Sequence, residues 1–180
     1  MTLMQIISAA LQQLGYATDA QTQKVWRDKF TQLANEGMLD LGEAIKLRRT
    51  DSIPVTGGEI NLDDLPFECV KVRGVSQNGA DVSYSRGSAT GKLAVSATGE
   101  VSVEYQYVPA AMSYDTDKPG IPERLHNLLV TYICACHHMG ANVDTQNRYN
   151  PLYSKYLRGR AAAKRYYDEP IGHSIINKGW

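Results

Sequence analysis

Residues 101–139 read VSVEYQYVPAAMSYDTDKPGIPERLHNLLVTYICACHHM, and two periodicities meet in this stretch. Residues 101–107 alternate between apolar and polar side chains, which predicts a strand with one buried face. After a loop over residues 109–121, Pro122 suits the first turn of a helix, and apolar residues recur at helical spacing from Leu125 onward. The chain thus changes from β to α structure here, which predicts an α+β protein.

Two further helices are expected before the strands. Thr2 is a suitable N-cap for a first helix, which Gly15 ends. A longer helix is expected to begin at Asp19 or Thr22, because one apolar face continues from there over about five turns. That face consists of Trp26, Phe30, Leu33, Gly37, Leu41 and Ala44.

Residues 52–108 show short alternating runs separated by turn residues, which predict a small antiparallel sheet or sandwich. Gly57-Gly58 is expected to close a first hairpin, and Asn78-Gly79 is a strong signal for another. Residues 92–97 are expected to pair with residues 100–108 around Thr98-Gly99.

A last helix is expected from Asp144 to about Tyr167, with a break or bend at Pro151. The predicted fold is therefore α+β: a four-helix bundle of two N-terminal and two C-terminal helices, with an antiparallel β insertion and an extended C-terminal tail. The predicted bundle comprises residues 1–50 and 117–167, the insertion residues 51–116 and the tail residues 168–180.

Charge is distributed unevenly along the chain. The 180 residues include 19 Lys and Arg and 19 Asp and Glu, and a net charge of zero argues against a generally basic nucleic-acid binder. Residues 51–123 hold 11 acidic and 5 basic residues, whereas residues 145–167 hold six basic residues and no acidic one. The six are Arg148, Lys155, Arg158, Arg160, Lys164 and Arg165.

Three interpretations of this basic helix are open. It could be a solvated face, it could meet the acidic surface of a neighbouring subunit, or it could contact nucleic-acid phosphates. We favour the second, because the chain supplies its own acidic region and a head-to-tail ring joins unlike faces of identical subunits. The third is the main alternative for the function, a nucleic-acid-binding module that uses residues 145–167.

The last residues combine polar, helix-breaking positions with large apolar side chains. A disordered terminus is the simplest interpretation, but the apolar residues favour a tail that docks onto another surface, for example by strand addition. The candidate docking residues are Ile171, Ile175, Ile176 and Trp180.

Residues that could carry chemistry do not assemble into a convincing motif. Cys134 and Cys136 are two positions apart on a helix and point to opposite sides, so they are poorly placed to bind one metal ion. Asp63-Asp64 and the pair Asp115 and Asp117 lie in expected loops, where Asp usually forms turns. We therefore expect no enzymatic activity, no metal and no cofactor.

Segments that would direct the chain to a membrane are not found. The sequence has no apolar run of the ~20 residues that a span requires and no secretory signal. Its three cysteines form no disulfide framework, which favours synthesis in a reducing cytoplasm.

The order of these elements resembles that of the head-to-tail connector (adaptor, or head-completion) proteins of tailed bacteriophages. The best match is Ile121–Ala141, IPERLHNLLVTYICACHHMGA, which is similar to a family pattern IPexxhxlLvxYaxAxxl. The other similar stretches are Met4–Gly15 (MQIISAALQQLG), Trp26–Leu47, Asp51–Val75 (DSIPVTGGEINLDDLPFECVKVRGV), Val103–Val108 with Pro109, and Asn147–Arg165. Asn150-Pro151 departs from the family pattern.

The resemblance implies a non-enzymatic virion structural protein. Connector proteins of this kind form a homo-oligomeric ring, usually a dodecamer, that binds the portal protein in the neck between head and tail. The implied partners are further copies of the chain, the portal protein, a tail or next connector protein, and DNA in nonspecific passage, with no membrane. The family's C-terminal segment reaches into the portal, which here corresponds to Ile171–Trp180.

Overall fold

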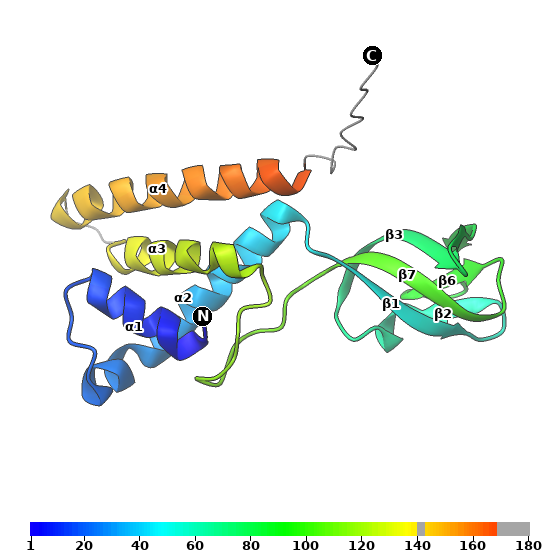
Figure 1. Ribbon diagram of the computed structural model, residues 1–180, viewed down its shortest axis with the longest axis horizontal. Coiled ribbons are helices and arrows are strands. Elements are labelled where there is room, and N and C mark those ends of the chain that lie inside the picture. Colours follow the sequence, from blue (N-terminus) through cyan, green and yellow to red (C-terminus); the bar gives the residue numbers. More distant parts are fainter. Residues whose placement is uncertain (140–142, 169–180) are drawn as a thin grey trace, which may run out of the picture.

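The computed structural model describes residues 1–139 and 143–168 of the 180-residue chain. Within these residues it contains four α-helices and seven β-strands. The helices gather at one end of the molecule and the strands at the other, as Figure 1 shows. The chain enters the strand region after α2 and returns to the helices before α3.

Capping residues set the starts of the first two helices. Helix α1 (Leu3–Gln13) begins with a capping box in which the Thr2 side chain accepts a hydrogen bond from the Gln5 backbone, while the Gln5 side chain accepts one from the Thr2 backbone. Helix α2 (Ala20–Ile45) begins at Asp19, whose carboxylate accepts from the backbone amides of Gln21 and Thr22 at 3.0 Å. Both predicted starts are confirmed.

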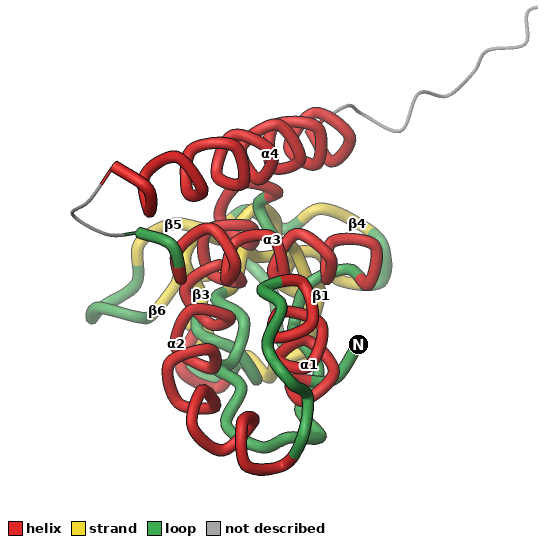
Figure 2. The backbone as a smooth tube through the Cα atoms, turned by 90° about the vertical axis from the view of Figure 1, so that its left-hand side faces the viewer, coloured by secondary structure: helices red, strands yellow, loops and turns green. Residues whose placement is uncertain are grey.

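The predicted four-helix bundle is wrong, although the α+β class is confirmed. Helix α3 (His126–His137) lies between α4 (Val143–Asp168) on one side and α1 and α2 on the other (Figures 1 and 2). Its consecutive residues 129–131 and 133–135 are all buried. A bundle helix buries one apolar stripe, whereas a helix that is buried all round becomes the middle layer of a stack.

The strands form two antiparallel sheets. The four-stranded sheet has the order β1 (Arg48–Val55), β7 (Gly99–Tyr107), β3 (Cys69–Gln77), β4 (Ala80–Asp81). The three-stranded sheet has the order β2 (Glu59–Asn61), β6 (Lys92–Val95), β5 (Tyr84–Arg86). Residues of both sheets share one core, so the region is a small sandwich; the core includes Ile53, Ile60, Val75, Val95, Val101, Val103 and Tyr105.

Two of the predicted strand pairings are wrong. The Gly57-Gly58 turn is closed as a tight hairpin turn by two backbone hydrogen bonds between Thr56 and Glu59, but the predicted pairing stops there: β1 pairs with β7, and β2 pairs with β6 in the other sheet. The Thr98-Gly99 turn likewise separates β6 from β7, which lie in different sheets. Both turns therefore carry the chain from one sheet to the other. The turn at Asn78-Gly79 is a true hairpin between β3 and β4, with positive φ at both residues, as predicted.

Helix α4 runs continuously through Pro151, so the predicted break at this residue does not occur. Proline removes one backbone donor from a helix but does not always end it, since packing against other elements can compensate. The two short 3-10 helices are Leu62–Asp64, between β2 and β3, and Glu123–Leu125, which leads directly into α3.

Candidate interaction surface on the last helix

The inner side of α4 packs on α3 through aromatic side chains. Tyr156 is fully buried, and its ring lies 5.0 Å from the ring of Tyr132 on α3. Tyr153 stacks on Tyr149 at 5.0 Å, one turn earlier on α4. Of the tyrosines that alternate with the basic residues in sequence, Tyr156 therefore faces the interior and Tyr153 packs against the helical core, while Tyr149 is half-buried and Tyr166 is exposed.

Arg160 is separated from the other basic residues by an internal contact. Its Nε donates to Asp40 Oδ2 on α2 at 2.7 Å, and the buried Tyr156 hydroxyl donates to the same oxygen. Burial and this hydrogen bond raise the pKa of Tyr156, and the hydrogen bond to Asp40 raises the pKa of Arg160. Arg160 therefore joins α4 to α2 and is not part of an outer face.

Four of the predicted basic residues form a stripe along the outside of α4. Their spacing of seven, three and seven residues places them on one side of a helix, and all four are exposed. None of them forms an ion pair with another described residue. We call this set the basic stripe: Arg148, Lys155, Arg158 and Arg165. Lys164 is also exposed but lies on the flank of α4 nearer to α2.

The end of α4 is held at two points. The Arg124 guanidinium lies 3.6 Å from the centre of the Tyr166 ring and 4.4 Å from that of Tyr167, and its Nε donates to the Tyr167 hydroxyl at 3.0 Å. Lys46, at the end of α2, donates to Asp168 at 2.9 Å, and this hydrogen bond lowers the pKa of Asp168. The last described residue of α4 is thus fixed beside the start of the sheet region.

The sheet region retains acidic side chains that its own bases do not neutralise. Asp51 pairs with Arg49 at 2.7 Å, and Glu59 lies 3.8 Å from Lys92. Several other acids are exposed and form no ion pair within the described residues: Asp63, Asp64, Glu68, Asp81 and Glu100. The acidic surplus therefore persists on the surface of the folded sheets.

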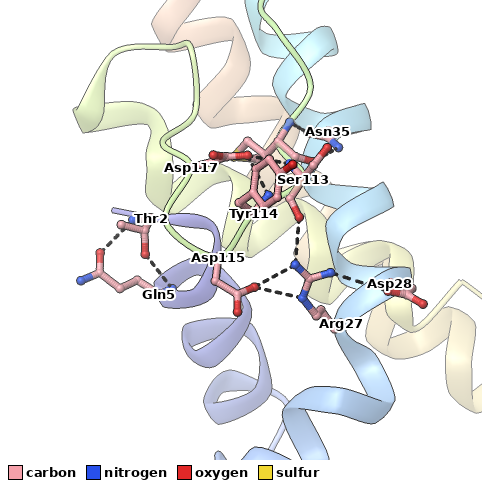
Figure 3. A network of polar contacts seen from close by, with 10 residues as sticks. Thr2, Gln5, Arg27, Asp28, Asn35, Ser113, Tyr114, Asp115 and Asp117 are labelled. Carbon is pink, nitrogen blue, oxygen red and sulfur yellow. Dashed lines mark hydrogen bonds and ion pairs between the residues drawn. The ribbon is translucent and has the colours of Figure 1, made fainter.

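The paired acids before α3 are structural. Asp115 accepts from Arg27 on α2 at 2.9 Å, and Asp117 accepts from the backbone amides of Ser113 and Tyr114 at 2.7 and 2.8 Å (Figure 3). Those backbone hydrogen bonds lower the pKa of Asp117. Asp63 and Asp64 lie in a single turn of 3-10 helix. Neither pair is arranged as a catalytic acid and base.

The cysteines and histidines at the end of α3 point into different surroundings and do not form one cluster. Cys134 is buried against α1, and burial raises the pKa of its thiol to about 12. His137 instead packs among Tyr16, Trp26 and Phe30, with Trp26 at a ring distance of 4.9 Å. Across residues 1–139 and 143–168, no three His, Cys, Asp or Glu side chains come together to hold a metal ion.

A groove beside the junction of helices and sheets was not predicted from the sequence. It has a volume of about 530 Å³ and lies between the end of α2 and strands β3 and β7. We call it the neck groove; its lining includes Leu39, Gly42, Lys46, Val70, Lys71 and Pro109. Because these residues come from separate elements, no local sequence pattern marks the groove.

The predicted docking residues Ile171, Ile175, Ile176 and Trp180 lie outside the described residues. Within the described part, no helix is both long and apolar enough to cross a bilayer. No protein-family model matches the chain, and no curated protein matches it significantly.

Proposed function

We propose that this protein is a non-enzymatic structural subunit of a homo-oligomeric ring in the neck of a tailed bacteriophage. The ring, twelvefold as in the connector proteins that the sequence resembles, joins the portal vertex of the head to the tail. The observation that carries the proposal is the basic stripe of α4, which no described residue neutralises, in a chain whose sheets keep an acidic surplus.

The two charged surfaces support a ring because they belong to different parts of one subunit. The stripe residues are exposed on α4. This helix is an outer layer of the helical region, and the sheets lie at the other end of the molecule (Figure 1). A head-to-tail contact brings unlike faces of neighbouring copies together, so the basic stripe of one subunit meets the acidic sheet surface of the next. Complementary charge also orients such an encounter and raises its rate.

The wider assembly follows from this role. The ring binds the portal protein on one side and a tail or next connector protein on the other, and DNA passes through it without sequence-specific contact. The chain is made in the host cytoplasm and is then incorporated into the virion. Residues 171–180 are the proposed contact with the portal, so a chain that ends at residue 168 should fold but fail to join portal rings.

Electron microscopy of the purified full-length protein, alone and with its portal ring, tests the proposal. We expect closed rings at low salt, or rings assembled on the portal, and fewer rings as salt screens the charged contact. A protein that stays monomeric in both preparations, at concentrations well above those of a virion assembly reaction, would contradict the proposal.

The basic stripe also suits a second function, a nucleic-acid-binding module. Its affinity would fall by about 0.9 log units per neutralised phosphate for each log unit of salt. Tyr156 is buried and Tyr153 packs against the helical core, which disfavours this alternative, because rings held in this way are not offered to bases for stacking. A salt titration with a DNA duplex separates the two: tight binding with a steep salt slope and no ring would favour the module.

A further inference from the structure

The neck groove presents apolar side chains that are unusually exposed for this protein. Val70 on β3 is 64% exposed and Leu39 on α2 is 45% exposed, and both line the groove. Gly42 also lines the groove, and a Cβ added there would lie 3.0 Å from Leu47 and 3.5 Å from Pro109. Glycine thus lets the end of α2 lie close to Leu47 and Pro109, the residues just before and after the sheet region.

The chain leaves α4 at the wall of this groove. Lys46 lines the groove, and its ammonium group holds the carboxylate of Asp168 at 2.9 Å. Figure 1 shows the end of α4 above the junction of α2 and the sheets. Ile171 follows Asp168 by three residues, which can span at most about 10 Å. The first large apolar residue after α4 is therefore within reach of the groove.

The composition of residues 169–180 matches the groove in apolar character and charge. The segment carries four large apolar side chains in twelve residues, and the groove exposes apolar surface that they could cover. Its first residue, Glu169, follows Asp168 in the sequence, so two adjacent acids come where the chain leaves α4, and the groove lining contains the cations Lys46, Lys71 and Arg73. The single acid that opposes these cations in the lining is Glu43.

Strand β3 adds a backbone feature that suits an extended segment. Its partner β4 pairs with it only at Ser76 and Gln77, so the earlier part of that edge has no strand partner among the described residues. Val70, Lys71 and Arg73, which line the groove, belong to this part. Adding a strand to such an edge is a common way to bind an extended peptide, and β-branched residues such as isoleucine favour it.

We propose that residues 171–180 of the same chain occupy the neck groove in the free subunit and cover Leu39 and Val70. We favour a segment of the same chain over one from a second copy, because a tether of a few residues holds the segment near the groove at an effective concentration in the millimolar range. The inference concerns the isolated protein and does not depend on the ring. It means that the proposed portal-binding residues are first held by their own subunit.

Hydrogen–deuterium exchange on the full-length protein tests this proposal at two protein concentrations. The groove variants are Val70→Asp and Leu39→Glu, each of which places a charge in the apolar lining. The matched control is Val25→Asp on α2, since Val25 is 63% exposed and lies outside the groove lining. Circular dichroism of every variant reports whether the fold is kept.

We expect amides of residues 171–180 to be protected in the unmodified protein and in Val25→Asp, at both concentrations. Either groove variant should reduce this protection by about tenfold or more, because a buried charge replaces apolar contact. Three results would overturn the proposal: no protection in the unmodified protein, equal protection in both folded groove variants, or protection that disappears on dilution, which would identify a second copy as the source.

Discussion

The Nε atom of Arg160 on α4 donates a 2.7 Å hydrogen bond to Asp40 on α2, residues that lie 120 positions apart. Tyr156 donates to the same carboxylate oxygen from one turn earlier. This contact separates Arg160 from the basic stripe of the last helix. Arg160 holds the helical layers together, while the basic stripe remains free to meet another molecule.

Removing the shared acceptor should destabilise the helical layers. In Asp40→Ala, the Arg160 guanidinium and the buried Tyr156 hydroxyl both lose their partner, which we expect to cost about 2 kcal/mol of unfolding free energy. Tyr156→Phe removes one donor and should cost about 1 kcal/mol. Urea unfolding measures both, with Asp28→Ala as control, because the Asp28 side chain is fully exposed.

Charge reversal at Arg158 or Arg165 should weaken ring assembly without changing stability. Both side chains are exposed and unpaired among the described residues, so Arg158→Glu and Arg165→Glu leave the core intact. Lys24→Glu makes the same change of charge at an exposed position on α2. Sedimentation and electron microscopy should show ring loss in the first two variants only. Equal assembly in all three would count against the stripe as an interface.

Gly37→Ala should destabilise the protein, although alanine is the better helix former by about 1 kcal/mol. The added Cβ would lie 2.9 Å from the Tyr132 ring, which packs in turn against Tyr156. We expect a net loss of about 1 to 2 kcal/mol by urea unfolding. The same substitution made together with Tyr132→Leu should cost less, and an unchanged cost would show that the ring is not the obstacle.

Stability should fall as the pH drops from about 6.5 towards 4, because of His137. Burial is the main cause that lowers the pKa of His137 to about 4, with Lys29 and His138 adding repulsion. The unfolded chain takes up this proton near pH 6.5. Between pH 6.5 and pH 4 the unfolded state therefore binds more protons than the folded state, which lowers the free energy of unfolding.

Replacing this imidazole tests the pH effect. The loss of stability between pH 7 and pH 5 should shrink by about 1 kcal/mol in His137→Phe, which keeps an aromatic ring among Trp26 and Phe30. Urea midpoints at both pH values measure it. His138→Asn is the comparison, since the protein buries His138 less, and an equal effect there would refute the assignment to His137.

The segment before α3 should loosen when Asn35 is removed. The Asn35 side chain donates to the Met112 carbonyl at 3.0 Å and accepts from its amide at 2.8 Å, as Figure 3 shows for this network. Asn35→Ala should cost roughly 1 to 2 kcal/mol and speed hydrogen exchange over residues 110–118. Gln32→Ala, at an exposed position on α2, should change neither quantity.

Local signals in the sequence predicted most elements but not how the elements associate. The caps at Thr2 and Asp19 and the hairpin at Asn78-Gly79 depend on neighbouring residues alone, and they are confirmed. The turns at Gly57-Gly58 and Thr98-Gly99 are equally clear in sequence, yet each joins two sheets. A turn residue specifies backbone dihedral angles and does not specify which strand becomes the partner.

The candidate interaction surface was predictable only in part. Helical spacing alone places Arg158 and Arg165 on one side of α4. No spacing indicates that Arg160 binds Asp40, because this contact depends on how α2 crosses the helical layers. The neck groove has the same origin, since it exists only where α2, β3 and β7 meet.

Strands β1 and β7 are the two ends of the sheet region, and they are direct neighbours, with Arg48 opposite Gln106. The region therefore enters and leaves the helical layers at one place, and its own core of buried residues meets the helical core at Tyr107. Such an arrangement is modular, because the buried residues that pack the sheets and those that pack the helices form two clusters joined at this one place.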